Sequence, residues 1–523
     1  MLNEGTLKRL IGVTILINAV VMLFSILPAH DPALYADIAK HMVLTNDWAN
    51  LVFNHTDWLD KPHFPFWITA LSCKFFGFSS FAYIFPGFVF HLIGAYYTYL
   101  LGCYLFNKQM GLLAVLFYVT AAHLLLSSID VRAEAYLLGE IMPACYYWWR
   151  YHDHPKIKLN YLFSGAFFTA LAMMTKGIFV LVTIAGGFIT LWFYHLLVGR
   201  HRETAKNRPQ PVLTWFIKWV SAGLLSFLFI APELITLYLQ FDLHPEKIVF
   251  NQTHVSGIKW FFWDSQIGRF FNGGPISGHT HSFHYLFFTY TFLWAFLPWS
   301  FLFIAATYWI IISLCSIDSR MNRHQRKAYI YLLGAFFPTF CMFSASSFQL
   351  DHYTNIIIPF AAMMCAGWVC HKQDASAVQS RLYNAIVYPT MLINLIFIGF
   401  MVVNRHNYIA YDVGYKIAEM LRQQPSLPII EYQDNSFTLA FHSKELPRVV
   451  ENTSQLLAEP TPYYLVIKKE KLAAIKNDLG DYQEMMHTTG VYFINNPLKI
   501  MISSLSKSGL EPNLTHYLVL RKQ

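Results

Sequence analysis

The feature that most constrains the fold is a series of apolar runs between Leu10 and Val403, several of them long enough to cross a lipid bilayer. A helix needs roughly 20 apolar residues to cross a hydrocarbon core of about 30 Å. Only 13% of the residues are charged, whereas soluble domains carry about 25%. The sequence therefore excludes an ordinary soluble enzyme and predicts an α-helical polytopic membrane protein.

About eleven of these runs are expected to be membrane helices, with ends uncertain by a few residues. They lie near residues 10–28, 81–106, 110–127, 133–150, 161–174, 177–198, 213–238, 283–314, 328–345, 353–371 and 383–403. The first run follows Lys8 and Arg9. It is longer than a usual signal core and lacks a good cleavage site, so we predict a retained helix.

Lys and Arg side chains collect in alternate loops, including the basic stretch 200–208. The positive-inside rule assigns those loops to the cytoplasm. The opposite loops, 29–80, 127–135, 239–282 and 344–354, then face outward, as does the tail from Asn404. These cytoplasmic loops and the tail's lysines account for the net charge of +8, so no nucleic-acid partner is implied.

The chain is predicted to have two domains. Residues 1–403 form a transmembrane catalytic domain whose outer loop 29–80 carries the site, and residues 404–523 form a small extracytoplasmic α/β domain. Within the second domain we expect strands at 428–433, 437–442, 463–468 and 516–520, and helices at 411–422 and 469–478. All seven cysteines lie in or beside apolar runs, which indicates neither a disulfide framework nor a zinc site, and no organic cofactor is expected.

Several charged residues lie on the outward side, at or near the ends of apolar runs. Such groups cost at least about 2.5 kcal/mol each at membrane depth unless paired or hydrated, so they often mark a functional cavity. Snorkelling side chains and the solvated ends of interfacial helices are the alternative explanation. The residues are Asp31, Asp60, Lys61, Asp130, Arg132, Glu134, Lys176 and Arg269.

This combination of charges suits the transfer of a sugar from a polyprenyl phosphate. That reaction needs a base for the incoming hydroxyl and positive charge on the leaving phosphate. Asp31 is the candidate base, and Lys61, Lys176 and Arg269 are candidates to bind the phosphate. A divalent metal ion is a further possibility, with candidate ligands Asp60, Asp130 and Glu134. Alternatively, these acids pair with Lys61 and Arg132.

A set of motifs in order along residues 31–360 resembles the GT-C membrane glycosyltransferases. Within them, the sequence is most similar to the lipid A aminoarabinose transferase and the bacterial protein O-mannosyltransferase-like enzymes. The motifs are Asp31-x3-Tyr35-Ala36-x-Ile38-Ala39, Asn46-Asp47-Trp48, Asp60-Lys61-Pro62-His63, Trp67, Phe76-Gly77-Phe78, Met174-Thr175-Lys176-Gly177, the run 260–270 ending in Arg269-Phe270, Leu297-Pro298-Trp299-Ser300, and Leu350-Asp351-His352-Tyr353 before Ile358-Pro359.

The resemblance implies a catalytic role for Asp31 and a phosphate-contacting role for Lys61 and Arg269. The substrate pocket is then expected to include Tyr35, Asp60, His63, Asp130, Glu134 and Tyr353. The sequence departs from the family at Asp31-Pro32, where Asp-Glu is usual, and at Leu34, where an arginine precedes the tyrosine. It also has Gln349-Leu350-Asp351 in place of Lys-Leu-Pro, which leaves the sugar and some phosphate contacts open.

We therefore predict an inverting glycosyltransferase in the bacterial cytoplasmic membrane. Its partners are a polyprenyl-phosphate-linked donor and a lipid, glycan or protein acceptor on the outer side. Two alternatives are a transporter or flippase of lipid-linked saccharides and an inactive relative. A transporter is expected to have broken helices at matching positions of two halves, and an inactive relative is expected to lose the charged motif residues.

Overall fold

The structure is a computed structural model that describes residues 3–28, 31–53, 56–198, 212–276, 284–316, 321–373, 379–411, 413–491 and 514–523. The basic stretch 200–208 lies outside these residues. The chain divides into two compact units. The helical unit consists of Met1–Met22, Asp47–Ile68 and Phe85–Ile396, and the α/β unit consists of Leu23–Asn46, Thr69–Ile84 and Phe397–Gln523.

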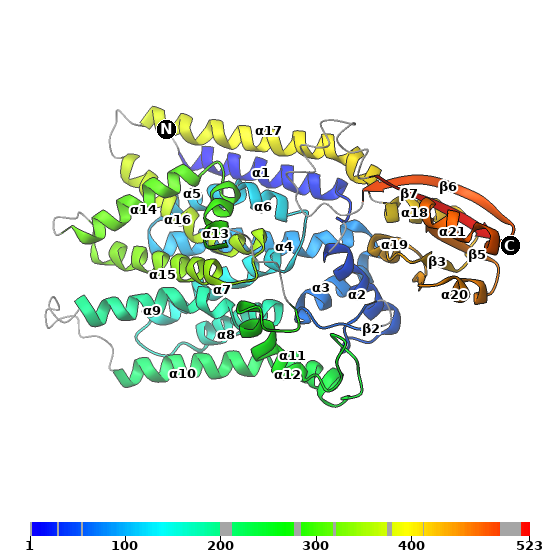
Figure 1. The fold of residues 1–523 in the computed structure, drawn as a ribbon. Helices are drawn as coiled ribbons and strands as arrows, with labels where there is room; N and C mark the ends of the chain where they lie inside the picture. The colour runs from blue at the N-terminus through cyan, green and yellow to red at the C-terminus, as the bar shows by residue number, and fades with distance from the viewer. Residues whose placement is uncertain are drawn as a thin grey trace. The chain divides into compact units, whose positions relative to one another are not determined.

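The helical unit contains most of the helices in the chain, and Figure 1 shows their order by colour. Its helices, including those with only their larger part in the unit, are α1 (Glu4–Phe24), α4 (Ser80–Leu105), α5 (Lys108–Val119), α6 (Ala122–Ser127), α7 (Ala133–Asp153), α8 (Leu159–Lys176), α9 (Val180–Val198), α10 (Val212–Phe229), α11 (Ala231–Leu237), η2 (Tyr238–Asp242), α12 (Gly257–Lys259), η3 (Trp260–Gly268), α13 (His284–Ala295), α14 (Ser300–Cys315), α15 (Arg323–Ala345), η4 (Asp351–Ile357), α16 (Ile358–Gln373) and α17 (Gln379–Tyr411). A short hairpin, β1 (Val52–Phe53) and β2 (Thr56–Asp57), belongs to the Asp47–Ile68 part of this unit.

Small residues and isolated polar contacts join the helices of this unit. Figure 1 shows α9 and α15 side by side, and a Cβ atom on Gly186 of α9 would lie 2.6 Å from the carbonyl oxygen of Gly334 in α15. Asn394 of α17 donates a hydrogen bond to the Thr14 hydroxyl of α1 at 3.0 Å. Close backbone approach and interhelical hydrogen bonds are typical of membrane helix bundles.

Six described helices are long and apolar enough to cross a membrane, or up to eight if each of two bent helix pairs forms one span. The bent pairs are Phe216–Phe229 with Ala231–Asp242, at 42°, and Tyr285–Ala295 with Ser300–Cys315, at 112°. Helices α5, α7 and α8 also lie where spans are predicted, but they are not among these eight. A mostly helical membrane fold is thus confirmed, whereas the number eleven stays a prediction.

The α/β unit contains a five-stranded mixed sheet in the order β4-β3-β5-β7-β6. Strand β3 pairs in parallel with β4 and β5, while β7 runs antiparallel to β5 and β6. The elements of the unit are α2 (Asp31–Thr45), α3 (Phe64–Phe76, its larger part), α18 (Val413–Arg422), β3 (Ile429–Tyr432), α19 (Phe437–His442), β4 (Arg448–Val450), α20 (Thr453–Ala458), β5 (Tyr463–Lys468), α21 (Lys469–Leu479), β6 (Tyr482–Val491) and β7 (Leu514–Lys522).

Helices pack against both faces of this sheet. Ile430 and Leu465 point to the face where Leu472 of α21 packs. Their neighbours Ile429 and Tyr464 point to the opposite face, which also includes residues of α18 and α19. This alternation follows from the period of two along a strand, and it explains why β3 is buried at every position.

The predicted strand at 437–442 is wrong, because these residues form the helix α19. The Ser436 hydroxyl accepts a hydrogen bond from the Leu439 amide at 3.3 Å and caps the first turn. The Glu431 carboxylate accepts a hydrogen bond from the Ser436 amide at 3.0 Å and holds the cap residue itself. A six-residue apolar run fits a buried strand and a buried helix equally well, and only the cap distinguishes the two.

Candidate active site

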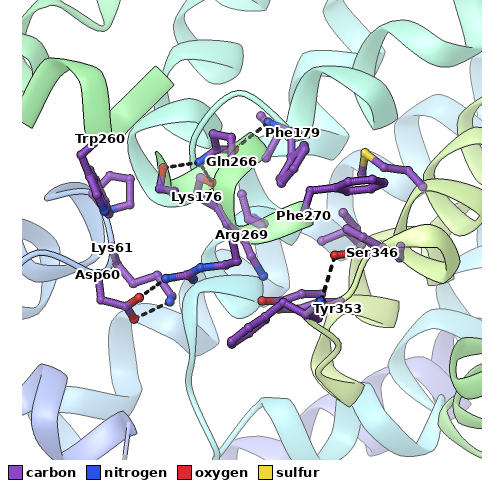
Figure 2. A pocket seen from close by; sticks show the side chains of 18 residues that line it. Asp60, Lys61, Lys176, Phe179, Trp260, Gln266, Arg269, Phe270, Ser346 and Tyr353 are labelled. Carbon is purple, nitrogen blue, oxygen red and sulfur yellow. Dashed lines mark hydrogen bonds and ion pairs between the residues drawn. The ribbon is translucent and has the colours of Figure 1, made fainter. Parts of the chain in front are cut away.

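A cavity in the helical unit is lined by charged residues from three separate parts of the chain (Figure 2). Asp60 and Lys61 come from the loop between β2 and α3, where Pro62 follows them. Lys176 is the last residue of α8, and Arg269 directly follows η3. The structure therefore brings together the three cations that the sequence assigns to the phosphate, together with the predicted pocket residues Asp60 and Tyr353.

The Asp60 carboxylate binds two cations, one on each oxygen. Lys61 Nζ donates to Oδ2 at 2.6 Å, and Arg269 Nη2 donates to Oδ1. Burial alone would raise the pKa of Asp60, but Lys61 and Arg269 lower it below its usual range. Asp60 is therefore an anion that holds two cations side by side, and the three groups together carry one net positive charge.

Lys176 lies between a carboxylate and an aromatic ring. Its ammonium forms an ion pair with Oε1 of Glu134, whose side chain is only 2% exposed. The same ammonium lies 3.5 Å from the ring centroid of Tyr353. His352 Nε2 is 3.7 Å from the other oxygen of Glu134. The predicted pocket residues Glu134 and Tyr353 thus both contact this lysine.

The turn after Lys176 depends on glycine and on Gln266. Gly177 has a φ of +85°, and a Cβ atom there would lie 2.1 Å from the Gln266 amide nitrogen. The Gln266 side chain accepts a hydrogen bond from the Phe179 amide at 3.3 Å and donates one to the Lys176 carbonyl at 3.4 Å. These contacts, drawn in Figure 2, fix the backbone that presents Lys176.

The other side of the cavity is apolar. Arg269 lies with its guanidinium 5.0 Å from the ring centroid of Phe348, so an aromatic side chain also covers one of the cations. An anion with an apolar tail would match this division between a cationic side and an apolar side. The apolar lining residues are Leu137, Phe179, Val180, Trp260, Phe270, Met342, Phe343, Phe348 and Ile356.

Three predicted pocket residues of the helical unit are not among those that line this cavity: Glu134, which reaches it only through Lys176, and also His63 and Asp130. His63 is fully buried, with Nδ1 3.1 Å from Glu233 Oε1 and Nε2 3.0 Å from the carbonyl oxygen of Ala49. These contacts fit a role in holding the loop before α3 in place. Asp130 is 38% exposed and accepts a hydrogen bond from Arg132 Nε at 3.3 Å.

Asp31 and Tyr35 belong to α2 in the α/β unit. Asp31 begins the helix and is half-buried, while Tyr35 is buried one turn further on. A carboxylate in the first turn of a helix is stabilised by the unpaired amide groups there.

The candidate metal ligands are all engaged by cations of the protein. Asp60 binds Lys61 and Arg269, Asp130 binds Arg132, and Glu134 binds Lys176. In the described part of the chain, no three His, Cys, Asp or Glu side chains come together in a way that could hold a metal ion. The metal ion therefore stays a prediction, and no step below passes through it.

Comparisons with known proteins find sequence relatives over most of the chain. The family model for dolichyl-phosphate-mannose-protein mannosyltransferase matches residues 60–235. The undecaprenyl phosphate-alpha-4-amino-4-deoxy-L-arabinose arabinosyl transferase of Wigglesworthia glossinidia brevipalpis is 26% identical over 435 residues, which are 76% of this chain and 67% of that protein. An uncharacterized protein of Aquifex aeolicus is 25% identical over 378 residues, which are 70% of this chain and 65% of that protein. The chain thus spans about two thirds of these relatives' lengths.

Solved structures share the fold over a larger part of the chain. ArnT from Cupriavidus metallidurans bound to undecaprenyl phosphate matches with a TM-score of 0.69 at 14% identity, over 98% of both chains. The oligosaccharyltransferase of Archaeoglobus fulgidus matches with a TM-score of 0.52 at 12% identity, over 91% of this chain and 71% of that chain. The fold is that of the GT-C membrane glycosyltransferases. Both the fold and the sequence of the chain resemble those of aminoarabinose transferases, which confirms the resemblance seen in the sequence.

Proposed function

We propose that this protein is a glycosyltransferase of the bacterial inner membrane that moves a sugar from a polyprenyl-phosphate donor to a lipid, glycan or protein acceptor. The observation that carries the proposal is the convergence of Lys61, Arg269 and Lys176 on one cavity with an apolar side. A polyprenyl phosphate has the same division into an anion and an apolar tail. The ArnT structure with the same fold was determined with undecaprenyl phosphate bound.

In the proposed reaction, Asp31 removes the proton from the acceptor hydroxyl. The acceptor oxygen forms a bond to the anomeric carbon of the sugar while the bond from that carbon to the phosphate oxygen breaks. The polyprenyl phosphate leaves with the electron pair, and Lys61 and Arg269 neutralise its charge. Attack opposite to the leaving group inverts the anomeric configuration.

A transfer assay tests this proposal. The purified protein in bilayers is supplied with polyprenyl-phosphate-linked pentoses and hexoses and with an envelope lipid extract as acceptor. Mass spectrometry should detect a sugar-modified acceptor and one released polyprenyl phosphate per transfer.

A donor that crosses the bilayer with its sugar still attached would instead support the flippase alternative. Both bent helix pairs lie between residues 216 and 315, and not at matching positions of two halves as that alternative expects.

The proposed site faces the outer compartment, and so does the tail from Asn404. This topology is supported by the alternation of basic loops along the sequence, which the positive-inside rule assigns to the cytoplasm. A phosphatase reporter fused after Gln523 should be active, because that enzyme matures only outside, whereas a fluorescent protein that matures only in the cytoplasm should stay dark. The opposite pattern would overturn the proposed topology.

A further inference from the structure

Helix α2, which begins with Asp31, contains a fully buried lysine within the α/β unit. Lys40 is 0% exposed. Its ammonium donates hydrogen bonds to the carbonyl oxygens of Ser443 at 2.6 Å and Ala440 at 2.7 Å, and a longer one to Phe441 at 3.4 Å. Burial of a charged amine is costly unless its donors are satisfied. The three carbonyl groups accept hydrogen bonds from the Lys40 ammonium, and these bonds hold α2 on the end of α19.

The end of α19 is suited to receive a cation. The last carbonyl groups of a helix have no partner within the helix and carry partial negative charge. Arg422 of α18 donates a hydrogen bond to the His442 carbonyl at 2.9 Å. Two basic side chains from different helices thus complete the same helix end, one from α18 and one from α2.

The surroundings of Lys40 exclude water. Its ammonium lies 5.5 Å from the ring centroid of Phe78, and the Phe78 ring packs edge-on against Phe441 at 6.3 Å. Asp37, one turn earlier on α2, is also buried, at 4% exposed. Burial raises the pKa of Asp37 to about 7 and lowers the pKa of Lys40 to about 8, although each group opposes the other's shift. Because Lys40 is buried, water cannot replace the carbonyl groups that accept its hydrogen bonds.

A second connection reaches the segment just before α2. The amide of Leu27 donates a hydrogen bond to the Ser80 hydroxyl at 2.9 Å, and that hydroxyl lies 3.5 Å from Nε2 of the buried His442. Leu27 and Lys40 lie on either side of Asp31 in the sequence. Both therefore connect to the last turn of α19, one through Ser80 and one directly.

We propose that Lys40 is a positioning residue, which fixes the orientation of α2 on the end of α19 and thereby the direction in which Asp31 points. The C-terminal part of the α/β unit then sets the geometry of transfer without contacting the reacting atoms. This inference rests on the proposed function through the role of Asp31. It gives the C-terminal part of the α/β unit, from Phe397 onward, a role in the chemical step although that part contains no candidate catalytic group.

The test compares Lys40→Met and Ser80→Ala with the matched control Lys444→Met in full-length protein. Lys444 is exposed and directly follows the same helix end. A misplacement of about 1 Å costs up to about 100-fold in rate, so Lys40→Met should lower kcat by about 10- to 100-fold while KM for the donor stays within about twofold. Ser80→Ala should lower kcat by about two- to fivefold, and the control should match wild type.

Hydrogen exchange gives a measurement that is independent of activity. In Lys40→Met, the amides of α2 should exchange faster, while those of β3 and β5 remain protected. A wild-type kcat in Lys40→Met, together with unchanged hydrogen exchange in α2, would overturn the proposal. A donor KM that rises by the same factor by which kcat falls would overturn it as well. If Lys40→Met does not fold, wild-type kcat and exchange in Ser80→Ala would overturn it. If the wild-type protein transfers no sugar, the proposed function fails. Unchanged hydrogen exchange in α2 of Lys40→Met would still refute, independently of that result, the claim that Lys40 fixes α2 on the end of α19.

Discussion

Replacement of Asp31 by asparagine should lower kcat by about two to four orders of magnitude, the usual size of a general-base contribution. Asparagine keeps the shape of the side chain but cannot accept the proton of the acceptor hydroxyl. Asp31 is half-buried at the first position of α2, so a side chain of the same size fits there without a change in packing. The variant should therefore fold, and its donor KM should stay near the wild-type value.

Single-turnover rates with a saturating donor measure this loss without interference from product release. The matched control is Asp481→Asn, which changes an exposed carboxylate in the α/β unit and should leave kcat unchanged. If folded Asp31→Asn protein transfers sugar at the wild-type rate, Asp31 is not the base. The base would then have to be sought elsewhere on the outward side of the chain.

Replacement of Arg269 by alanine should lower kcat/KM for the donor by about 100- to 1,000-fold, as loss of one group that stabilises transition-state charge does in other enzymes. Arg269 is 9% exposed and contacts both Asp60 and the ring of Phe348, so its guanidinium is held in place before the donor binds. Arg269→Lys should recover only part of the activity, because lysine cannot make a bidentate contact.

Steady-state kinetics over a range of donor concentrations would measure the effect of Arg269. Lys259→Ala is the matched control, since Lys259 is a mostly exposed cation shortly before η3 and should not affect the donor. Lys61→Ala should weaken catalysis as well. The double variant should lose less than the sum of the two single effects, because Lys61 and Arg269 share Asp60. Wild-type kinetics in both single variants would place the phosphate site elsewhere.

The apolar pattern was sufficient to predict most of the helices, because long runs leave little choice of structure in a membrane. Charge at membrane depth indicated part of the cavity, although Asp130 and Glu134 do not line it. Lys61, Lys176 and Arg269 are far apart in the sequence, yet they line one cavity. The physical reason is the same for all three, since an ionisable group near a bilayer needs either water or a partner.

Contacts between distant residues could not be predicted in this way. Gln266 looks like an ordinary polar residue in an aromatic run, and its role depends on the turn at Gly177. His63 belongs to a motif with charged neighbours, but its two ring nitrogens contact Glu233 and Ala49. Lys40 lies in the first outer loop of the sequence prediction without any sign of burial, and its partners are about 400 residues away in the chain. A single sequence contains no local signal for such pairs.

The position of Asp60 between two cations has a consequence for turnover. Without a bound donor, Lys61 and Arg269 would repel each other, and the carboxylate supplies the counter-charge that keeps them in place. In the proposed reaction, an arriving lipid phosphate would compete with Asp60 for Lys61 and Arg269, and Asp60 would bind both cations again once the phosphate has left. Asp60 is thus a built-in competitor of the product. Asp60→Asn should make free polyprenyl phosphate a stronger inhibitor, measured as a lower inhibition constant. By this argument, Asp60 weakens binding of the lipid phosphate and thereby speeds its release.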